Sequence, residues 1–385
     1  MSSKKTILFF HQSSDLYGSD KTLLQLVKGL NKNLYHPVVV LPSKGPLYDA
    51  LFQLDIQLIV TPVLNIHKKM FTIKSLLGLP YHLVKSILKL NRTLKHTHID
   101  IIQSNTTVVL LGFIYAKLKG ITHFWHIHEV MEKPKVAVFF FPRLVNFCAD
   151  KVIFNSKTTM DSFCTVKPKL KSKSIVIYNG LERFSTNLDV NQIKDKKQKF
   201  NIAQDHLVIS LVGRFNNNKG HELLLKSFSR IIKKQKNIYL LFTGSAVKGK
   251  GILFENIQKT IQKQGLNEKV IILPFQNNIW DIWDITDIAV VPSTIKESFG
   301  LVALEAMLSS KPVVATDYGA LSEVIIHNKT GLLFKLNDVD DLTYKLQTLI
   351  TKESLRSQLG QNAKRDAQKR FSLAAYINQF EALYK

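Results

Sequence analysis

Residues 207–243, LVISLVGRFNNNKGHELLLKSFSRIIKKQKNIYLLFT, carry the pattern that decides the fold. An aliphatic run at 207–212 leads into a polar loop, and the apolar residues of 221–234 then recur at helical spacing. A second apolar run follows at 238–243. A strand, a helix and a strand in this order indicate a βαβ unit with two parallel strands.

The same alternation extends along the chain on both sides of this unit. Further strands are predicted at 6–10, 36–41, 57–60, 99–103, 122–126, 152–155, 175–178, 269–273, 288–291 and 312–315. Further helices are predicted at 21–30, 253–264, 300–309, 340–351 and 372–384. We therefore predict an α/β fold of two doubly wound, Rossmann-like domains whose strand ends face one ligand-binding cleft.

A domain boundary is expected near the middle of the chain. The alternation lapses between 181 and 204, where the stretch NLDVNQIKDKKQKFNIAQD is polar and lysine-rich. We predict a first domain at 1–180 and a second at 181–365. A helix within 366–385 is expected to pack back against the first domain.

The composition excludes a disordered chain, because 45% of the 385 residues are hydrophobic. The 53 basic and 29 acidic residues give a net charge of +24, which attracts nucleic acid, anionic lipid or phosphorylated substrates. Two cysteines, Cys148 and Cys164, cannot build a disulfide framework, and we expect a cytoplasmic protein. The start of the chain does not resemble a signal peptide, and no apolar run reaches the roughly 18 residues that a membrane span needs.

Two cations lie in the loop between the predicted strand at 207–212 and the helix at 221–234. Arg214 and Lys219 therefore precede a helix N-terminus, where backbone N–H groups and the helix dipole favour an anion. Arginine can hold phosphate oxygens with two parallel hydrogen bonds, and lysine adds a point charge. The alternative is an ordinary basic loop, since lysine is abundant throughout the chain.

Two glutamates, Glu297 and Glu305, occur in the stretch PSTIKESFGLVALE. Glu305 falls in an apolar segment, so its buried carboxylate needs hydrogen-bond donors, which a pair of sugar hydroxyls would supply. Ser298, Phe299 and Gly300 form the entry to the predicted helix, where glycine permits close backbone approach and the N-terminus can hold a phosphate. The alternative is that Glu305 bonds a neighbouring backbone segment and that Glu297 is solvated.

A pair of histidines, His126 and His128, ends the predicted strand at 122–126 in the stretch WHIHEV. We expect the two rings to point to opposite faces of the strand, one to the cleft and one to the interior. Their spacing does not match a zinc-binding helix, and we predict no metal site. A lone histidine on a strand is more often structural, but Glu129 and the strand-end position favour a functional role.

Two glycine-containing loops follow predicted strands. Gly18, in DLYGSDK, would let a backbone amide approach a diphosphate or a sugar, and the alternative is a plain tight turn. The stretch GSAVKGKG at 244–251 nearly matches a phosphate-binding loop. Gly251 stands where a Ser or Thr should bind magnesium, so we reject a nucleotide triphosphatase.

In this order, VGRFNNNKG, KESFGLVALEAM, KPVVATDYGALSEVI and NKTGLLF resemble the motifs of the family 4 retaining glycosyltransferases (glycosyl transferases group 1), which have the GT-B architecture. The resemblance is strongest at 207–334 and weaker at 1–180. IVIYNGLE resembles the segment that precedes the crossing between domains, and KRFSLAAYINQFEALYK resembles the family's terminal helix. The resemblance implies an acceptor-side first domain and a nucleotide-sugar-binding second domain.

The resemblance also implies roles for matching residues. Arg214 and Lys219 would bind the diphosphate of the donor, and Glu305 would hold its ribose hydroxyls. Glu297 would contact the transferred sugar. The helix entry that follows would add backbone contacts to the sugar and to a phosphate, through Ser298, Phe299, Gly300, Leu301 and Val302.

In the first domain, the resemblance places His128 near the reacting sugar, with His126 as the rival. Gly18 matches a flexible glycine loop, although the usual Gly-Gly pair is here Tyr17-Gly18. No cofactor or metal is implied, since the fixed cations replace a metal ion at the leaving diphosphate. A front-face route to retention needs no protein nucleophile, whereas a double displacement would have to use Glu297 or a base near His128.

The resemblance implies a hexosyltransferase-type enzyme that acts on a glycan or a lipid-linked acceptor in bacterial surface polysaccharide or glycolipid synthesis. The competing functions are a nucleotide-sugar epimerase with the same fold, a phosphorylase, a catalytically inactive partner of another transferase, and a nucleic-acid-binding protein. The last is disfavoured because no nucleic-acid-binding module is recognisable.

A segment at 67–95 offers one explanation for the excess of positive charge. Four apolar residues share one face of a predicted helix there, namely Leu83, Ile87, Leu90 and Leu94. Lys85, Lys89 and Arg92 lie on the opposite face. Such a helix can lie in an anionic membrane surface, as expected of a peripheral protein on the inner face of the plasma membrane, or it can be an ordinary surface helix.

Overall fold

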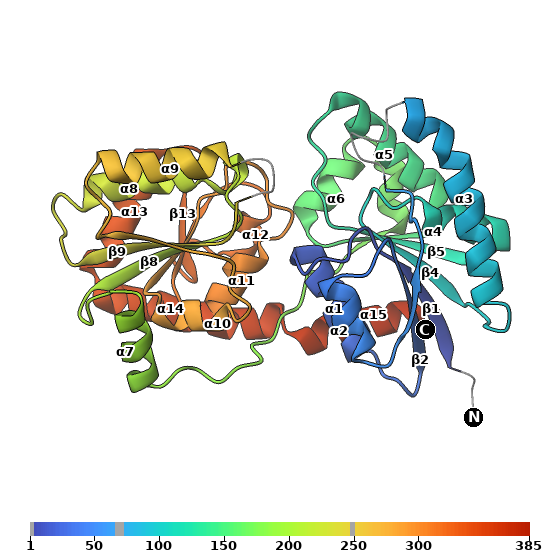
Figure 1. The fold of residues 1–385 in the computed structure, drawn as a ribbon, viewed down its shortest axis with the longest axis horizontal. Coiled ribbons are helices and arrows are strands. Elements are labelled where there is room, and N and C mark those ends of the chain that lie inside the picture. The colour runs from blue at the N-terminus through green and yellow to red at the C-terminus, as the bar shows by residue number, and fades with distance from the viewer. Residues whose placement is uncertain (1–3, 66–72, 247–250) are drawn as a thin grey trace. The chain divides into compact units, whose positions relative to one another are not determined.

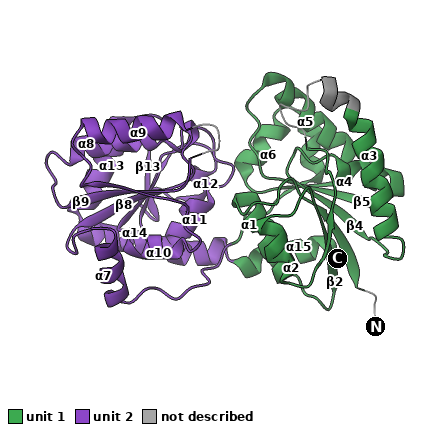
Figure 2. Ribbon diagram, viewed as in Figure 1, with its two compact units in different colours: residues 1–180, 373–385 green, residues 181–372 purple. Residues whose placement is uncertain are grey.

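The computed structural model describes residues 4–65, 73–246 and 251–385. The chain forms two compact units (Figure 2). Unit 1 comprises residues 1–180 and 373–385, and unit 2 comprises residues 181–372. Each unit is built around its own parallel sheet, which confirms the predicted α/β fold with two doubly wound sheets.

Unit 1 contains a seven-stranded sheet with the order β3-β2-β1-β4-β5-β6-β7. Figure 1 labels its strands β1, β2, β4 and β5. Its strands are β1 (Lys5–Phe10), β2 (Tyr35–Leu41), β3 (Gln57–Val60), β4 (Ile101–Asn105), β5 (Thr122–Ile127), β6 (Lys151–Phe154) and β7 (Ser174–Val176). Its helices are α1 (Gly18–Gly29), α2 (Pro46–Phe52), α3 (Ile73–Thr93), α4 (Leu111–Lys119), α5 (Lys135–Cys148), α6 (Lys157–Cys164), the short 3₁₀ helix η2 (Pro168–Lys173) and α15 (Leu373–Tyr384).

Both faces of this sheet are covered, and β1 shows why its sequence is apolar throughout. Side chains alternate between the two faces of a strand. Ile7 and Phe9 pack in the cluster that α1, α2 and α15 cover, whereas Leu8 and Phe10 pack in the cluster beneath α3 and α4. Because β1 is buried on both faces, its sequence at 7–10 is a continuous apolar run and does not alternate with polar residues.

The C-terminal helix α15 completes the core of unit 1. The hydroxyl of Tyr384 donates a hydrogen bond to Oε1 of Gln103 at 2.6 Å, and its ring stacks on Phe124. The hydroxyl of Tyr35 donates to the backbone oxygen of Glu381 at 2.9 Å. These bonds satisfy buried polar groups between segments that lie almost 300 residues or more apart in sequence, so the helix belongs to this unit.

Unit 2 contains a six-stranded sheet with the order β10-β9-β8-β11-β12-β13. Its strands are β8 (Leu207–Val212), β9 (Ile238–Thr243), β10 (Val270–Leu273), β11 (Ile288–Val291), β12 (Val313–Thr316) and β13 (Gly331–Phe334). Its helices are α7 (Val190–Lys199), η3 (Asn217–Lys219, 3₁₀), α8 (His221–Ile231), α9 (Ile252–Lys263), α10 (Trp280–Ile285), α11 (Leu301–Leu308), α12 (Leu321–Val324), α13 (Val339–Thr351) and α14 (Glu353–Arg370).

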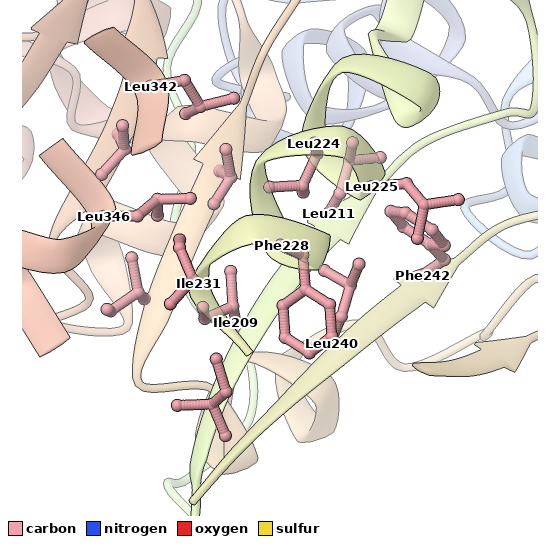
Figure 3. Packing of buried hydrophobic residues seen from close by; sticks show 14 of the residues in the cluster. Ile209, Leu211, Leu224, Leu225, Phe228, Ile231, Leu240, Phe242, Leu342 and Leu346 are labelled. Carbon is pink, nitrogen blue, oxygen red and sulfur yellow. The ribbon is translucent and has the colours of Figure 1, made fainter. Parts of the chain in front are cut away.

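The core of unit 2 lies between its sheet and α8, α9 and α13. Figure 3 shows the apolar face of α8 packed on β8 and β9. The buried side chains of this layer include Leu224, Leu225, Phe228 and Ile231 from the helix and Ile209, Leu211, Leu240 and Phe242 from the strands. The quoted βαβ stretch therefore forms the centre of the unit, as its pattern predicts.

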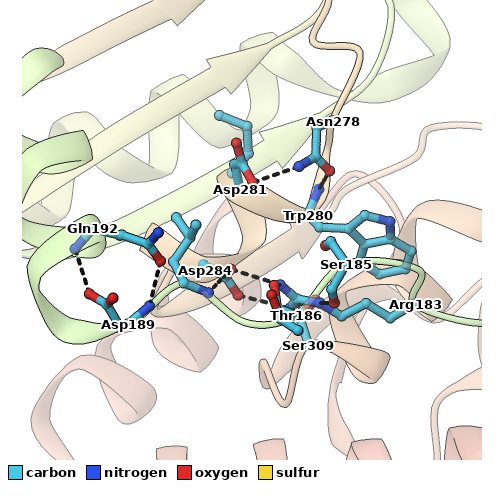
Figure 4. A network of polar contacts seen from close by, with 12 residues as sticks. Arg183, Ser185, Thr186, Asp189, Gln192, Asn278, Trp280, Asp281, Asp284 and Ser309 are labelled. Atoms are coloured by element: carbon cyan, nitrogen blue, oxygen red, sulfur yellow. Dashed lines mark hydrogen bonds and ion pairs between the residues drawn. The ribbon is translucent and has the colours of Figure 1, made fainter.

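A buried ion pair ties the start of unit 2 to its helices (Figure 4). The guanidinium of Arg183 donates to both carboxylate oxygens of Asp284 at 2.8 and 2.7 Å. The side chains are only 9% and 5% exposed. The N–H of Leu188 also donates to Asp284, and Arg183 donates to the backbone oxygens of Ser185 and Thr186. The segment at 183–188, where the chain enters unit 2, is thus held by hydrogen bonds that involve charged side chains. Such bonds are stronger than those between neutral groups.

The structure differs from the predictions in several elements and in one boundary. Besides α7, seven α-helices were not among those predicted, namely α2, α4, α5, α6, α10, α12 and α14. The polar stretch that indicates a domain boundary contains a helix, α7, which is absent from the predicted set. The strand β13 is also absent from that set. Unit 2 continues to Ser372 because α14 extends without interruption to Arg370, so residues 366–372 belong to unit 2 and not to the returning helix.

The helix for which a membrane surface and an ordinary surface position were both open uses its predicted apolar face for folding. Leu90 and Leu94 are buried in the core of unit 1, and Leu83 and Ile87 pack against the same cluster. The predicted apolar face of α3 therefore packs on the core of its own unit, while Tyr81, Val84 and Leu88 of the same helix remain 64%, 55% and 62% exposed. Residues 66–72 of this stretch lie outside the described residues. Across the described parts of the chain, we find no helix whose length and apolar character would suffice to cross a bilayer.

Candidate active site

The strand order of each sheet reverses direction at one point. In unit 2 the first strand, β8, lies between β9 and β11, so the connections after β8 and β11 leave toward opposite sides. In unit 1 the same point lies between β1 and β4. Ligands of open α/β sheets bind at the carboxyl ends of strands beside such a point.

An ion pair bridges this point in unit 2. Nζ of Lys219, in the loop after β8, lies 2.6 Å from Oε1 of Glu297, in the loop after β11. The hydroxyl of Ser293 donates to the same oxygen at 2.5 Å. Two of the predicted site residues, 78 positions apart in sequence, are therefore in direct contact.

The two loops are also tied through their backbones. The N–H of Thr294 donates to the oxygen of Asn218 at 2.9 Å. Gly220 adopts a φ of +71°, and a Cβ there would lie 1.9 Å from the backbone oxygen of Pro292. Gly319 has a φ of +72° and leaves room for the backbone of Glu297, with which it pairs. Glycine is required where the loops approach so closely in left-handed conformations.

The surroundings of Glu297 keep its carboxylate ionised. Burial raises the pKa of this group, but the charge of Lys219 and the hydrogen bonds from Lys219 and Ser293 outweigh that effect and lower it. Glu297 is thus a fixed anion beside a fixed cation. Such a pair can accept hydroxyl groups on one side and attract phosphate oxygens on the other.

Arg214 lies directly after Gly213 at the end of β8, and its side chain is exposed. The aliphatic stem of Lys219 passes over Gly213, where a Cβ would contact it at 3.5 Å. The loop from Arg214 to Lys219 leads into α8, as predicted. Both cations therefore belong to one strand–loop–helix connection, beside the N–H groups of a helix start.

The second predicted group lies at the start of α11. Gly300 is the N-cap residue with a φ of +95°, and Phe299 before it is buried. Leu301 and Val302 are the first residues of the helix, whose N–H groups lack partners within the helix. Glu305 lies one turn further and is only 6% exposed, which confirms the predicted burial of its carboxylate. Ser298 joins this helix start to Glu297.

In unit 1, a buried pair that sequence analysis did not single out joins the loop after β1 to the start of α1. Nε2 of His11 lies 2.7 Å from Oδ1 of Asp20, and both side chains are almost fully buried. The hydroxyl of Ser13 donates to Asp20 at 2.5 Å, and the N–H of Tyr17 donates at 2.8 Å. Gly18, the predicted flexible residue, is the first residue of α1 and is exposed.

The expectation about the two histidines of β5 is wrong. His126 and His128 do not point to opposite faces, because their ring centroids lie 3.9 Å apart. Side chains alternate at every residue, so positions two apart share a face. His126 is 1% exposed and packs against Phe380 of α15, whereas His128 follows the strand end and is 9% exposed.

Both rings are held neutral by their environment. Burial lowers the pKa of His128 to about 3, and repulsion from His11 adds to this effect. Burial also lowers the pKa of His126 well below its usual range, with repulsion from His128 and His11 as further causes. These rings can donate or accept hydrogen bonds, but they do not carry charge at neutral pH.

Glu129 has a structural role in this arrangement. Its Oε2 accepts hydrogen bonds from the N–H and the hydroxyl of Thr107 at 3.0 and 2.8 Å, and from the N–H of His128. Burial raises its pKa, although these bonds act in the opposite direction. Glu129 therefore ties the end of β5 to the loop after β4, on the edge that carries the candidate residues.

His11, Asp20 and Ser293 are the residues that sequence analysis missed. His11 and Ser293 carry the same sequence signal as the predicted residues, because each is a polar residue within two positions of a strand end. Asp20 lacks this signal, since it lies ten positions after β1, in the first turn of α1. No group of three or more His, Cys, Asp or Glu side chains that could hold a metal ion occurs within residues 4–65, 73–246 and 251–385. The stretch GSAVKGKG lies partly outside the described residues, since 247–250 are not among them.

Two family models match the chain. The model "Glycosyltransferase Family 4" matches residues 17–183, in unit 1 except for its last three residues. The model "Glycosyl transferases group 1" matches residues 192–366, in unit 2. The two matches follow one another along the chain and include every residue of the candidate site except His11 and Ser13.

Curated relatives share moderate identity with the chain. The capsular polysaccharide biosynthesis glycosyltransferase CapM of Staphylococcus aureus is 26% identical over 246 residues, which is 63% of each chain. An uncharacterized glycosyltransferase of Methanocaldococcus jannaschii is 28% identical over 239 residues, or 61% of this chain and 60% of the relative. The alignments thus span about three fifths of the length of these relatives.

Solved structures share the fold over almost the whole chain. HepE of Anabaena in complex with UDP and glucose superimposes with a TM-score of 0.85 and 23% identity over 98% of both chains. The apo form of the lipopolysaccharide outer core galactosyltransferase WaaB gives a TM-score of 0.72 and 17% identity, again over 98% of both chains. At this identity the likeness establishes a common GT-B fold.

Proposed function

Since this chain belongs to family 4 of the glycosyltransferases, we propose that it transfers a sugar from a nucleotide-diphosphate donor to a hydroxyl group of an acceptor, with retention of configuration. The observation that carries the proposal is the contact between Lys219 and Glu297 at the reversal point of the unit 2 sheet. It combines a cation for a leaving phosphate with an anion for sugar hydroxyls, on loops that the surrounding backbone holds in place.

The leaving group needs positive charge that is already in position. When the bond between the anomeric carbon and the diphosphate breaks, negative charge grows on the phosphate oxygens. Lys219 and Arg214 supply fixed cations there in this proposal, and the proposal requires no divalent metal. Because Glu297 and the stem contact with Gly213 already orient Lys219, its ammonium needs little reorganisation as that charge develops.

The donor would be held from two directions by the loop after β11 and the helix that follows. Lys219 and Ser293 both bond Oε1 of Glu297, and Oε2 would accept a hydroxyl of the transferred sugar. Backbone N–H groups at Leu301 and Val302 would bind a phosphate oxygen. Glu305, one turn along α11, would bind the two ribose hydroxyls. The relative HepE is described in complex with UDP-glucose, and we propose a donor of this class.

Unit 1 would supply the acceptor side. We propose His128, and not His126, as the residue near the reacting sugar, because it lies beyond the strand end and is the more exposed of the two. Its low pKa suits a hydrogen-bonding role over a charged one. Gly18 would let the start of α1 approach the ligand. The pair of His11 and Asp20 would hold the loop that carries it.

The relatives and the charge support a proposal for the acceptor class. One relative is named for capsular polysaccharide synthesis, and a structural relative for the lipopolysaccharide outer core. We propose a glycan or lipid-linked acceptor of bacterial surface polysaccharide or glycolipid synthesis. The net charge of +24 suits an acceptor carried on a lipid phosphate at the cytoplasmic face of the membrane, where the protein would be peripheral.

A panel of nucleotide sugars tests the proposal. We expect the purified protein to release nucleoside diphosphate from one donor class, with the same rate in the presence of EDTA. Replacing Glu305 with Gln should weaken binding of that donor at least tenfold by calorimetry, because the anion is the better acceptor for ribose hydroxyls. Wild-type donor affinity in E305Q would contradict the ribose role. Conversion of a donor to its epimer without diphosphate release would identify an epimerase instead.

A further inference from the structure

Helix α5 in unit 1 exposes an apolar face that folding does not use. Val136, Phe139, Phe140 and Phe147 are 78%, 61%, 48% and 82% exposed. They recur at positions i, i+3, i+4 and i+11, which places them along one side of a helix. Scattered apolar residues are normal on a surface, but four large ones aligned on one helix indicate an interaction site.

The opposite face of α5 already supplies the contacts that hold the helix. Phe141, Val145 and Cys148 are at most 5% exposed and pack in a cluster with Trp125 and Phe154. The helix therefore has two apolar faces, of which only one is covered. The exposed face (the α5 face) is defined by Val136, Phe139, Phe140 and Phe147, together with Arg143.

Cations accompany the α5 face. The guanidinium of Arg143 lies over the ring of Phe139, 3.4 Å from its centroid, so the charge and the apolar surface are presented together. Lys133 and Lys135 are exposed at the start of the helix, and Lys151 is exposed shortly after its end. Two acidic residues, Glu132 and Asp150, flank the helix, so the four cations Lys133, Lys135, Arg143 and Lys151 outnumber them over residues 130–151. Apolar side chains with a basic rim match a bilayer surface that contains anionic lipid.

A second copy of the chain fits this face poorly. Residues 1–180 carry 24 basic and 9 acidic residues, so two such units repel one another at the contact. A surface that is both apolar and negatively charged has the complementary character. We propose that the α5 face docks the protein on a membrane containing anionic phospholipid, with the phenylalanine rings inserted among the headgroups.

The position of α5 in the chain links this surface to the candidate site. Only residues 129–134 separate His128 from the first residue of the helix. Seven peptide steps span at most about 25 Å, so the start of the α5 face lies within that distance of the strand edge that carries His128. This inference deepens the proposed function, because it names the surface through which the protein would reach a membrane-borne acceptor. The biological role of the docking rests on the proposed function, whereas membrane binding itself does not depend on it.

Flotation with vesicles tests the proposal. The full chain is mixed with vesicles of phosphatidylcholine alone, or of phosphatidylcholine and phosphatidylglycerol in a seven-to-three ratio, at low and high salt. We expect flotation only with the anionic vesicles, weakened by high salt. The double variant Phe139→Ser/Phe147→Ser should lose at least tenfold in partitioning. Phe52→Ser is the matched control, because Phe52 is an equally exposed phenylalanine (62%) on α2 of the same unit.

Four outcomes overturn the docking proposal: no flotation of the wild-type protein, equal flotation of the double variant, an equal loss in Phe52→Ser, or a dimer in light scattering that the double variant dissolves. The last outcome would assign the α5 face to a second copy. Donor hydrolysis is measured on the same samples. If the wild-type protein hydrolyses a donor but does not float, the docking proposal fails alone. If it floats but accepts no donor, the proposed function fails alone.

Discussion

Nζ of Lys219 lies 2.6 Å from Oε1 of Glu297, and this ion pair joins the loops after β8 and β11 at the reversal point of the unit 2 sheet. Both partners are partly buried, with 28% and 17% of the side chains exposed. Neither residue is a neighbour of the other in sequence. The contact is therefore a product of the fold, since it joins residues 78 positions apart in sequence.

The first prediction concerns this pair. Replacing Lys219 with Met or Glu297 with Gln should each lower kcat/KM for donor hydrolysis about 10²–10³-fold, because each removes one member of a preorganised charge pair. The double variant should cost little more than either single change, since the two side chains act as a unit. Steady-state kinetics of the four proteins measure the coupling. Lys226→Met, an exposed lysine on α8, serves as the control and should retain full activity.

The second prediction concerns Gly220. Its φ is +71° and an added Cβ would lie 1.9 Å from the oxygen of Pro292, so Gly220→Ala forces the two site loops apart. We expect a loss of about 3 kcal/mol or more in the free energy of unfolding by urea. Gly265 has a φ of +64° and open space around it, so Gly265→Ala should cost only about 1 kcal/mol. Equal losses in the two variants would refute the steric argument.

The third prediction separates a buried ion pair from an exposed one. Asp284→Ala leaves the guanidinium of Arg183 buried without its carboxylate and should destabilise the protein by about 3–5 kcal/mol. Asp340→Ala removes the partner of Arg230, in a pair whose side chains are 52% and 88% exposed, and should cost less than about 1 kcal/mol. Urea denaturation of both variants measures the difference. A loss below 1 kcal/mol in D284A would show that the pair in Figure 4 contributes little.

The fourth prediction concerns acid. Burial lowers the pKa of His123 to about 4 in the folded protein, against an ordinary value of 6.5. The unfolded chain then binds the proton more readily, so stability is unaffected above pH 6.5 and falls as the pH drops from 6.5 towards 4. At pH 5 this single group should cost about 2 kcal/mol.

The substitution His123→Gln tests this origin. It should reduce the fall in unfolding free energy between pH 7.5 and pH 5, measured by urea denaturation at both values. His98→Gln is the control, because the His98 side chain is 87% exposed. The assignment is incorrect if H123Q and the wild-type protein lose the same stability over this range.

Much of the fold follows from local patterns. The bounds of β8, β9 and β11 agree with the predicted strands, because each is an apolar run between polar loops. The strand β13 was missed, because its four residues, GLLF, give only a short apolar run directly after a turn. The helix α7 is polar along most of its length, so it lacks the apolar spacing of a helix. Its local signal was the capping box of Asp189 and Gln192.

The candidate site was predictable by residue type but not by arrangement. Lys219 and Glu297 could be selected because each lies between a strand and a helix, but their contact could not be derived from two segments 78 positions apart. The pair of His11 and Asp20 was missed, because only His11 directly follows a strand, whereas Asp20 lies in the first turn of α1. The relation between His126 and His128 was predicted wrongly, and correct use of the strand period alone would have placed them on one face.

The sequence by itself determined the alternation of strands and helices and the burial of Glu305. It also identified the loops that carry the candidate cations and carboxylates. These features depend on the spacing of residues that lie close together in sequence, because the geometry of a helix or a strand fixes which of their side chains share a face. Only the tertiary structure decided which loops meet, that α15 completes the core of unit 1, and that one face of α5 remains uncovered. Strand order and helix packing depend on contacts between segments that are distant in sequence. The free energy of these contacts depends on both segments together, so it cannot be inferred from either segment alone.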